Sequence, residues 1–584
     1  FDPALVFDFK GNYFRKGSAA STFGASITHA ATTNATMVDS DGLLKWRPHN
    51  NLTKSNTFST WSKNSIVVDN AAVGPNGIAN TASTVNFPST TSYLYNLSTV
   101  AVSAGDKVTF AAWVRSDTIT SLTFATNGRT NAANNTPEAN LAVTSTWTLV
   151  SFEATVAAND TGLFFAFGKV NPTSPASQIG DLELYGAHMF RSDLGGMVNN
   201  PDTTSSYVPT TTAAVYLSRR GHHIYNGSAW VNEGILHESE SRTNLLTSSG
   251  DVTGTGWTTD LSAGTLTTGS PFGTYQTISP TSTGTGSNGA KVYQIGKTLT
   301  SGATYVVSAL AKYSAGSGWF IVMPYNTSPS FAGSNAAWFD LQNGVVGSKD
   351  AAIIDHGMID YGDGWWLCWA SKNAGSTSGG ASLEVVNANG SFDRSAADTL
   401  LIAGSQLELG ATQSSYISTT SASATRAAET LTVPAANLPY NSTNMSIQMD
   451  GKMTYADEGA SLTAKFFEWT KDSNDNVVLR LDTDAGSGDV VFIQEAGGTQ
   501  DFVQSVSAYS PSINVPFNIA SRHGSTFING AIDGVALTAN TTPTALPNLS
   551  STDLNLGQTF MGTIGQCRMW SDDITDAGTV EAST

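Results

Sequence analysis

The sequence predicts an all-β protein made of tandem jelly-roll or β-sandwich modules. Short stretches of alternating apolar and polar residues recur along the chain, for example at residues 446–453 and 478–482. This period of two places one side of a strand in a core and the other in solvent. Gly, Asn, Asp and Ser separate the stretches, and no long segment has the apolar spacing of an amphipathic helix. Many short strands joined by turns are typical of sandwiches and jelly rolls.

A tandem duplication suggests the domain organisation. The phrases that begin at Asn51 and Asn244 each open a segment that closes on Ser-Ser-Tyr, at Tyr207 and Tyr416. Each segment is long enough for a complete domain and too long for a solenoid repeat. We therefore expect four parts: an N-terminal arm over residues 1–50, a jelly-roll module over 51–217, its repeat over 218–430, and a C-terminal sandwich over 431–584.

Landmarks inside the two copies recur in the same order. Trp61 and Trp257 follow the openings, and a Leu-Glu-Leu phrase precedes each closing tyrosine. Aligning that phrase makes Glu183 and Glu408 equivalent. A glycosidase would need its two carboxylates about 5–9.5 Å apart, which two separate modules do not favour. We interpret both glutamates as ordinary strand residues.

The sequence contains few charged residues, and acidic residues outnumber basic ones. Charged residues make up 13% of the chain, the net charge is −18 at pH 7, and runs of Lys and Arg are absent from the sequence. Nucleic acids and anionic membranes attract basic patches, so we expect neither as a partner. No apolar run reaches the length of a membrane helix, so we expect no membrane insertion. The polar surface must come from Ser, Thr, Asn and Gly, a composition typical of extracellular and virion proteins.

The two cysteines predict no disulfide framework. Cys368 and Cys567 fall in different predicted domains, and Cys368 stands in an aromatic strand where a small buried apolar residue is expected. Stability must therefore come from cores or from assembly.

Several motifs are compatible with ligand chemistry but are better explained as loops. Residues 284–289 have the glycine spacing of a dinucleotide loop, yet a strand pattern rather than a helix follows them. Residues 472–476 and 482–486 alternate acids and amides as calcium loops do, but they lack the glycine and bidentate Glu of an EF-hand. We interpret both as hairpin turns, and a calcium ion in the C-terminal domain stays an alternative.

Neither a catalytic site nor a cofactor site is predicted. His222, His223 and His237 have no Cys, Asp or Glu at metal-ligand spacing. The sequence also lacks the Gly-x-Ser-x-Gly, His-Glu-x-x-His, Cys-x-x-Cys and P-loop motifs. We therefore expect a protein that is not an enzyme and that has neither a cofactor nor a catalytic metal.

Aromatic rings are the remaining candidates for ligand contact, because sugars present apolar faces that stack on exposed Trp and Tyr. Of Trp338, Trp365, Trp366, Trp469 and Trp570, at least three are expected in cores. Only one of Trp365 and Trp366 can face solvent on an alternating strand. The candidate glycan contacts are Trp338, Trp366, Trp469, Asp472, Asp475 and Trp570.

Three phrases resemble the recurring phrases of tailed-bacteriophage head spike, head fibre and tail fibre proteins. They are residues 38–52, residues 238–246, and the Leu-Glu-Leu-Gly-Ala to Thr-Arg-Ala-Ala-Glu run at 407–429. The resemblance covers roughly residues 20–430 and implies galactose-binding-like jelly rolls on a virion. The first copy departs from it, reading His-Asn-Asn at 49–51 where the second reads Arg-Thr-Asn at 242–244.

Residues 431–584 are similar to concanavalin-A-like, laminin-G-type lectin domains. The similarity rests on the Phe-Ile-Asn-Gly hairpin at 527–530 and the Arg-Met-Trp phrase at 568–570, which an acidic turn follows. It implies sugar binding by the C-terminal domain.

Together the resemblances imply a bacteriophage virion appendage, exposed on the exterior of the particle, that contacts host surface polysaccharide without catalysis. They imply attachment to other virion proteins through residues 1–50 and, as is common for such appendages, a homotrimer. Two alternatives stay open: a purely structural capsid or neck decoration, and the carbohydrate-binding modules of a secreted carbohydrate-active enzyme.

Overall fold

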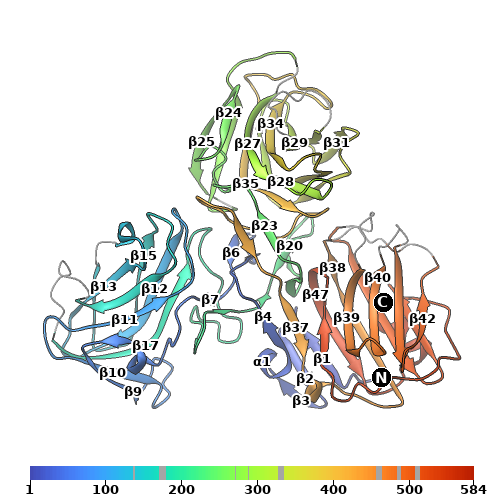
Figure 1. Ribbon diagram of the computed structural model, residues 1–584, viewed down its shortest axis with the longest axis horizontal. Coiled ribbons are helices and arrows are strands. Elements are labelled where there is room, and N and C mark those ends of the chain that lie inside the picture. The colour runs from blue at the N-terminus through green and yellow to red at the C-terminus, as the bar shows by residue number, and fades with distance from the viewer. Residues whose placement is uncertain are drawn as a thin grey trace. The chain divides into compact units, whose positions relative to one another are not determined.

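The computed structural model (Figure 1) describes residues 1–135, 139–169, 179–269, 271–286, 289–325, 335–454, 463–482, 488–506, 509 and 513–584. Strands dominate these residues; the helices among them are α1 (Phe23–Ser26), α2 (Thr575–Ala582) and 3-10 turns at Phe58–Thr60, Ala132–Asn134 and Ala435–Asn437. The prediction of an all-β protein is confirmed. None of the helices in the described ranges is long and apolar enough to cross a membrane.

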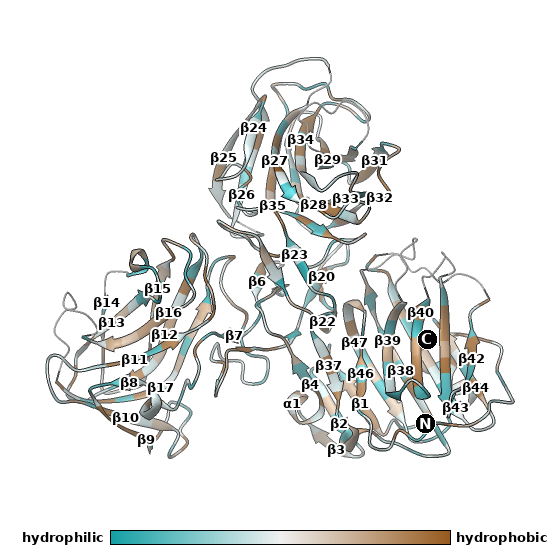
Figure 2. Ribbon diagram, in the orientation of Figure 1, coloured by the Kyte–Doolittle hydropathy of each residue, from teal (hydrophilic) through white to brown (hydrophobic). Residues whose placement is uncertain are grey.

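The chain divides into two compact units. The larger unit comprises Phe1–Leu43, Ser218–Ser418 and Ala424–Thr584, and the smaller comprises Leu44–Leu217 and Thr419–Ser423. The smaller unit therefore holds the first copy of the duplication, and the larger holds the second copy and the C-terminal sandwich. Along the strands of both, hydrophobic and hydrophilic residues alternate (Figure 2).

The smaller unit is a sandwich of two five-stranded antiparallel sheets. One sheet runs in the order β15 (Thr148–Thr155), β12 (Lys107–Arg115), β17 (Gly180–Arg191), β10 (Ala82–Phe87) and β9 (Ile66–Ala72). The other runs β14 (Ala139–Ala142), β13 (Ser121–Gly128), β16 (Leu163–Gly168), β11 (Tyr93–Ser98) and β8 (Ser62–Lys63). Their facing sides enclose a core that includes Phe110, Phe124 and Phe165, all fully buried. A short pair, β7 (His49–Asn50) with β18 (Val215–Tyr216), joins the entry and exit of the module.

The second copy is a sandwich of two six-stranded sheets. The first has the order β24 (Thr258–Asp260), β27 (Ala290–Thr298), β34 (Ser378–Val386), β29 (Trp319–Tyr325), β30 (Ala337–Asp340) and β31 (Val345–Lys349). The second has the order β25 (Ser262–Thr268), β26 (Thr274–Pro280), β35 (Thr399–Leu409), β28 (Thr304–Ala315), β33 (Trp365–Asn373) and β32 (Asp355–Asp360). Cys368 is a buried member of its core, as expected, and it is a free thiol like Cys567.

The C-terminal sandwich consists of two larger sheets. One has the path β3 (Ala19–Ser21), β2 (Tyr13–Lys16), β1 (Leu5–Asp8), β47 (Met561–Trp570), β38 (Asn444–Met453), β43 (Pro516–Gly524), β44 (Ile528–Ile532) and β45 (Val535–Ala536). Two further strands branch from this path: β22 (Ile235–Glu238) pairs with β47, and β19 (Arg219–Arg220) pairs with β22. The other has the path β4 (Thr28–Ala30), β37 (Thr430–Val433), β46 (Leu554–Leu556), β39 (Thr463–Asp472), β40 (Asp475–Asp482), β41 (Asp489–Ala496) and β42 (Thr499–Gln504).

The N-terminal segment is part of this C-terminal sandwich rather than a separate arm. Strand β1 pairs with β47 so that Phe7 lies opposite Cys567, and β4 pairs with β37. Phe7, Phe9, Phe14 and Phe23 pack in the same core as the C-terminal strands. Burying four aromatic side chains stabilises this docking, at about 1.5–3 kcal/mol for each. Of the segment that we expected to be an arm over residues 1–50, residues 1–43 thus belong to the larger unit and residues 44–50 to the smaller one. A role of this segment in attachment stays a prediction.

Asn50 and Asn244 occupy the same place in the two copies. Each amide donates two hydrogen bonds to backbone carbonyls and accepts two from backbone N–H groups, over distances of 2.9–3.2 Å. The partners are Ala187, Val208, Leu52 and Met189 for Asn50, and Ser405, Ile417, Leu246 and Leu407 for Asn244. The duplication is therefore real, but aligning Asn51 with Asn244 is wrong by one residue.

The closing tyrosines confirm the corrected alignment. The hydroxyls of Tyr207 and Tyr416 lie 2.7 Å from the hydroxyls of Ser55 and Ser249, five residues after each asparagine. The tyrosine rings lie against Gly186 and Gly404, both with φ of +66°, a conformation that glycine adopts without strain.

Because Gly186 matches Gly404, Glu183 and Glu408 are not equivalent. Glu183 precedes its glycine, whereas Glu408 follows its own and is fully buried. The Leu-Glu-Leu phrases thus lie at different positions in the two copies. Trp61 and Trp257 do correspond, because each indole N–H donates to the carbonyl of a positive-φ residue, Lys54 or Ser248.

Candidate functional site

Three of the predicted glycan contacts are core residues. Trp338, Trp469 and Trp570 are 3%, 2% and 4% exposed. Their indole N–H groups donate to backbone carbonyls, at 2.9 Å to Ser391, 2.8 Å to Thr552 and 3.3 Å to Phe1. A ring enclosed on both sides cannot stack on a sugar, so these three predictions are wrong as surface contacts.

Trp365 and Trp366 take opposite sides of strand β33, as alternation requires, but Trp366 is on the core side with Cys368 and Ala370 rather than on the outer side. Trp365 is 5% exposed, and Trp366 is half-buried, with its ring beside the turn at Gly344. Four of the five candidate tryptophans are thus buried, which agrees with the expectation that at least three lie in cores.

The acidic hairpin between β39 and β40 is a tight turn held by its own lysine. Lys471 Nζ lies 2.9 Å from Asp475 and 3.8 Å from Asp472, and the backbone N–H of Asn474 donates to Asp472 at 2.8 Å. An ammonium group therefore occupies the place between the two carboxylates where a cation would bind. The second acidic phrase lies outside the described residues at positions 483–486, as do positions 287 and 288 of the glycine-rich loop.

The histidines do not form a metal site. His222 and His237 are buried, and burial lowers the pKa of each, to about 3 and about 4. Across the described ranges no group of three or more His, Cys, Asp or Glu side chains is arranged to hold a metal.

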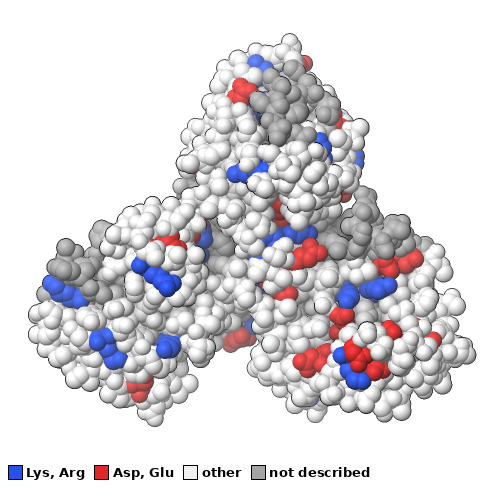
Figure 3. All heavy atoms as spheres, in the orientation of Figure 1, with Lys and Arg blue, Asp and Glu red and all other residues white. Residues whose placement is uncertain are grey.

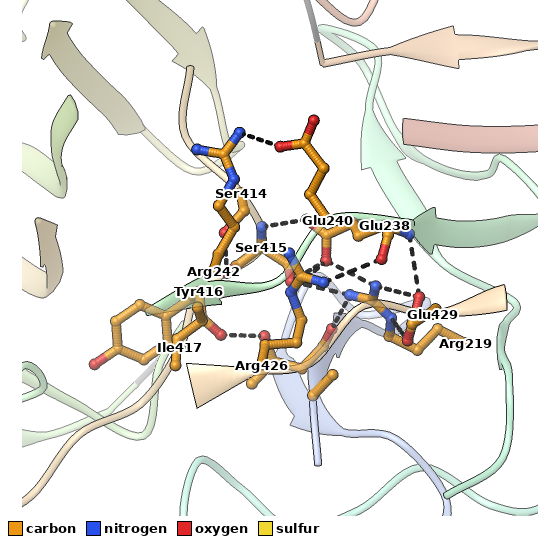
Figure 4. Close-up of polar contacts among 12 residues, drawn as sticks. Arg219, Glu238, Glu240, Arg242, Ser414, Ser415, Tyr416, Ile417, Arg426 and Glu429 are labelled. Atoms are coloured by element: carbon orange, nitrogen blue, oxygen red, sulfur yellow. Dashed lines mark hydrogen bonds and ion pairs between the residues drawn. The ribbon is translucent and has the colours of Figure 1, made fainter. Parts of the chain in front are cut away.

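A buried charge cluster lies in the larger unit (Figure 4). Arg219 binds Glu429 through two nitrogens, at 3.2 and 2.7 Å, and its Nη2 lies 2.7 Å from Glu238. Glu238 also lies 3.0 Å from Arg426 and accepts from the backbone and hydroxyl of Ser415, at 2.8 and 2.6 Å. These four charged side chains are at most 1% exposed.

Burial pushes the pKa of Glu238 upward, but Arg426, Arg219 and Ser415 outweigh it and hold that pKa at about 2. Two arginines balance two glutamates without an exposed group among them. The cluster fixes the segment that carries Tyr416, and we interpret it as structural. By contrast, charge on the visible surface is scattered in small groups over mostly uncharged atoms (Figure 3).

A different surface has the properties of a ligand site: the outer side of the sheet β15-β12-β17-β10-β9. Phe110, Ala112 and Val114 of β12 are fully buried in the core. Alternation therefore points Trp113 and Arg115 away from the core, and both are half-buried. We call this outer side the aromatic face and define it by Ile66, Val68, Thr84, Asn86, Trp113, Arg115, Trp147, Leu149, Asp181, Glu183 and Tyr185.

Two aromatic side chains stand in a row with a leucine on this face. Trp113 lies opposite Leu149 on β15 and opposite Tyr185 on β17. Leu149 is 43% exposed, and Trp113 and Tyr185 are half-buried. Directly opposed residues on neighbouring strands have Cβ atoms about 4.5–5.5 Å apart, so the three side chains form one continuous platform.

The next row is polar and ends on exposed valine. Arg115 lies opposite Glu183, which lies opposite Thr84, which in turn lies opposite Val68. Nε of Arg115 donates to Glu183, and the guanidinium stands 5.1 Å from the ring centre of Trp147. The Trp147 indole is anchored by a 3.2 Å hydrogen bond to the carbonyl of Val73.

Further contacts fix the polar groups and the tyrosine. Asn86 donates to Asp181 at 2.6 Å, beside Ile66, which is 63% exposed. The ring of Tyr185 lies 5.5 Å from that of Tyr207. Burial raises the pKa of the Tyr185 hydroxyl, against a hydrogen bond with Asn56. Contacts within the protein hold these side chains in place, so binding would cost little ordering entropy.

The two copies differ on this side of the sandwich. The corresponding sheet of the second copy carries Trp365 and Trp369, which are only 5% and 3% exposed. The aromatic face therefore belongs to the first copy. Its signal was present in the sequence: residues 107–115 alternate, with Trp113 at an outward position, but alternation alone does not say whether an outward ring is covered.

Comparisons with known proteins give no family. No family model matches the chain, and no curated protein does. Among solved structures, the sialidase CBM40 domain of Ruminococcus gnavus bound to α2,3-sialyllactose is similar over 26% of this chain and 86% of its own, with 15% identity and a TM-score of 0.21. Domain 4 of AbnA, a GH43 extracellular arabinanase of Geobacillus stearothermophilus, in complex with arabinotriose, is similar over 27% of this chain and 73% of its own, with 15% identity and a TM-score of 0.22. The receptor-binding domain of botulinum neurotoxin mosaic serotype C/D is similar over 26% and 40%, with 12% identity and a TM-score of 0.21. Likenesses of this extent assign no function.

Proposed function

We propose that this protein binds carbohydrate without catalysis, and that it does so on the aromatic face of its smaller unit. The observation that carries the proposal is the row of Trp113 and Tyr185 beside the Arg115–Glu183 pair. Ring faces bind the apolar side of a sugar, and fixed donors and acceptors next to them bind its hydroxyl groups.

Charge favours a neutral glycan. The face carries one cationic side chain, Arg115, against the carboxylates of Glu183 and Asp181, and the whole chain has a net charge of −18. An anionic polysaccharide would meet repulsion both at long range and at the site.

The phage-appendage resemblance of residues 38–52, 238–246 and 407–429 supports a biological setting for this binding. We propose a virion appendage, exposed on the exterior of the particle, that contacts host surface polysaccharide. Homotrimeric assembly would supply the multivalency that weak sites need, since linking sites raises avidity by roughly 10² to 10⁴. Attachment to other virion proteins through the N-terminal strands belongs to the same proposal.

Binding of the full-length protein to a panel of neutral and acidic glycans, displayed at high density, tests the proposal. Trp113→Ala should weaken binding to neutral glycans about tenfold, because a stacked ring contributes roughly 0.5–1.5 kcal/mol beyond buried area. Phe502→Ala removes an aromatic side chain that is 49% exposed in the C-terminal sandwich and should leave binding unchanged.

Two results would contradict the proposal. If Trp113→Ala binds as the wild type does, the aromatic face is not the site. If the protein in multivalent form binds neither the glycans nor host cells, the proposal of carbohydrate binding is replaced by that of a purely structural decoration.

A further inference from the structure

A lysine and an asparagine from opposite sheets meet inside the second copy. Lys372 lies on β33, two residues beyond Ala370, which faces the core, and four beyond Cys368, which also does. Asn335 lies just before β30, on the other sheet of the sandwich. The Lys372 ammonium nitrogen donates to the side-chain carbonyl oxygen of Asn335. The contact therefore spans the two sheets at the edge of their common core.

The surroundings favour reaction at this contact over an ordinary surface hydrogen bond. Asn335 is 1% exposed, so its amide carbon is shielded from water. Burial lowers the pKa of the Lys372 amine, against the charge of Asp350, which raises it. A larger fraction of the lysine is then the neutral amine, the form that acts as a nucleophile.

Asp350 supplies a carboxylate beside the segment that carries Asn335, and its charge also acts on the Lys372 amine. Asp350 follows β31. Its Oδ2 accepts a hydrogen bond of 2.9 Å from the backbone N–H of Ala336, which is the residue next to Asn335. The backbone N–H of Asp350 donates to the carbonyl of Ala336, also at 2.9 Å, so the two segments are fixed side by side. A carboxyl group held in this position can take a proton from one nitrogen and give it to another.

We propose that Lys372 and Asn335 form an intramolecular isopeptide bond that links the two sheets of the second copy. The neutral amine of Lys372 attacks the side-chain amide carbon of Asn335, and the carbonyl electrons move to oxygen. Asp350 takes a proton from the attacking nitrogen and delivers it to the departing amide nitrogen. The carbonyl re-forms, the bond from the carbon to the asparagine nitrogen breaks, and ammonia leaves. No oxidant and no further reactant is required.

The bond would cross-link this chain covalently, as a disulfide does in other proteins. Both cysteines are free and buried, so neither contributes a cross-link. The bond would close a loop between positions 37 residues apart. Cross-links of this kind stabilise mainly by restricting the unfolded chain, so the bond should raise the stability of the second copy.

The intact mass of the full-length protein, measured after denaturation, tests the proposal. We expect the wild-type mass to fall below the sequence mass by one ammonia, and protease digestion to release a branched peptide that joins Lys372 to Asn335. Lys372→Arg keeps the charge and cannot form the bond, so it should have the sequence mass. Asn335→Asp should form the same bond with loss of water and give the wild-type product. Asp350→Ala should leave most of the chain unlinked.

Lys349→Arg is the matched control. Lys349 is a neighbouring lysine whose amine donates to the backbone carbonyl of Ile354, where no isopeptide can form, so the cross-link should persist in this variant. The proposal is overturned if the wild-type protein has the full sequence mass. It is equally overturned if Lys372→Arg, shown by circular dichroism to be folded, still loses ammonia, because the loss then arises at another amide.

Discussion

Asn50 and Asn244 make the same four backbone hydrogen bonds in two modules whose surrounding sequences differ. Both side chains are fully buried, and each joins the opening of its module to a long central strand and to the closing segment. A single amide thus reinforces the short strand pair that joins the entry and exit of each module, β7 with β18 in the first copy and β23 (Arg242–Asn244) with β36 (Ala424–Arg426) in the second. This role explains why the opening and closing sequences are similar in the two copies, whereas the loops between them differ.

Replacing either asparagine by alanine should strongly destabilise its module. Four buried backbone groups would lose a partner, and each unsatisfied buried group costs about 1–3 kcal/mol. We expect Asn50→Ala to lower the free energy of unfolding by at least about 3 kcal/mol, measured by urea denaturation. Asn199→Ala, at an exposed position of the same unit, is the control. Equal unfolding midpoints for the two variants would show that the amide bridge is dispensable.

A methyl group at Gly404 should be far more harmful than one at Gly296. Both glycines have positive φ, +66° and +76°, so alanine at either costs about 1 kcal/mol or slightly more in backbone strain. At Gly404 the new Cβ would lie 2.5 Å from the ring of Phe272, whereas at Gly296 nothing lies within 4 Å. Thermal unfolding of Gly404→Ala should therefore occur well below that of Gly296→Ala. Similar melting temperatures would mean that the Phe272 ring moves aside freely.

Acid should destabilise the protein from about pH 6.5 downward. Burial lowers the pKa of His49 and His222 from 6.5 to about 3 in the folded state. Their ring nitrogens accept the backbone N–H groups of Arg191 and Val38, so a proton there would break those bonds.

The unfolded chain therefore takes up protons first as pH falls below 6.5, and stability is lost until the folded pKa of about 3 is reached. Each histidine contributes roughly 1.4 kcal/mol per pH unit well inside this window. Urea unfolding at pH 7.5, 6, 5 and 4 measures the slope, and His49→Gln should flatten it. Constant stability from pH 6.5 to 4.5 would contradict the assignment.

The stability that the buried charge cluster gives the protein should depend little on salt, but removing one of its charges should lower that stability strongly. Glu238→Gln leaves Arg219 and Arg426 with less compensating charge in a dry site, and breaking a buried pair costs about 3–5 kcal/mol. The exposed pair of Lys107 with Glu153, at 3.3 Å, is the comparison, because Glu153→Gln should change stability little. Denaturation at low and high salt distinguishes the two. A mild effect of Glu238→Gln would mean that water enters the cluster.

Sequence patterns predicted local features well. The alternation in residues 446–453 and 478–482 predicted strands, and the structure has β38 and β40 there. Alternation also placed Trp365 and Trp366 on opposite sides of one strand. These properties follow from the two-residue period of a β-strand, which is local and needs no knowledge of distant residues.

Pairing between distant segments was beyond the sequence. The Leu-Val-Phe-Asp sequence of β1 is typical of a strand. Its neighbour β47, however, lies more than five hundred residues away, and no local sequence pattern predicts that these two strands pair. The register of the duplication was off by one for the same reason: Asn50 and Asn51 are both asparagines, and only the four hydrogen bonds decide which of them matches Asn244.

The sequence by itself determined that this is an all-β chain with a repeated module, because strand periodicity and turn residues act over a few positions. Only the tertiary structure decided which aromatic rings reach solvent. Trp469 and Trp113 both lie on alternating strands, yet Trp469 is 2% exposed and Trp113 stands half-exposed beside Tyr185. A strand's own sequence fixes which side a residue takes, whereas the segments that pack over that side come from elsewhere in the chain and decide whether it is core or surface.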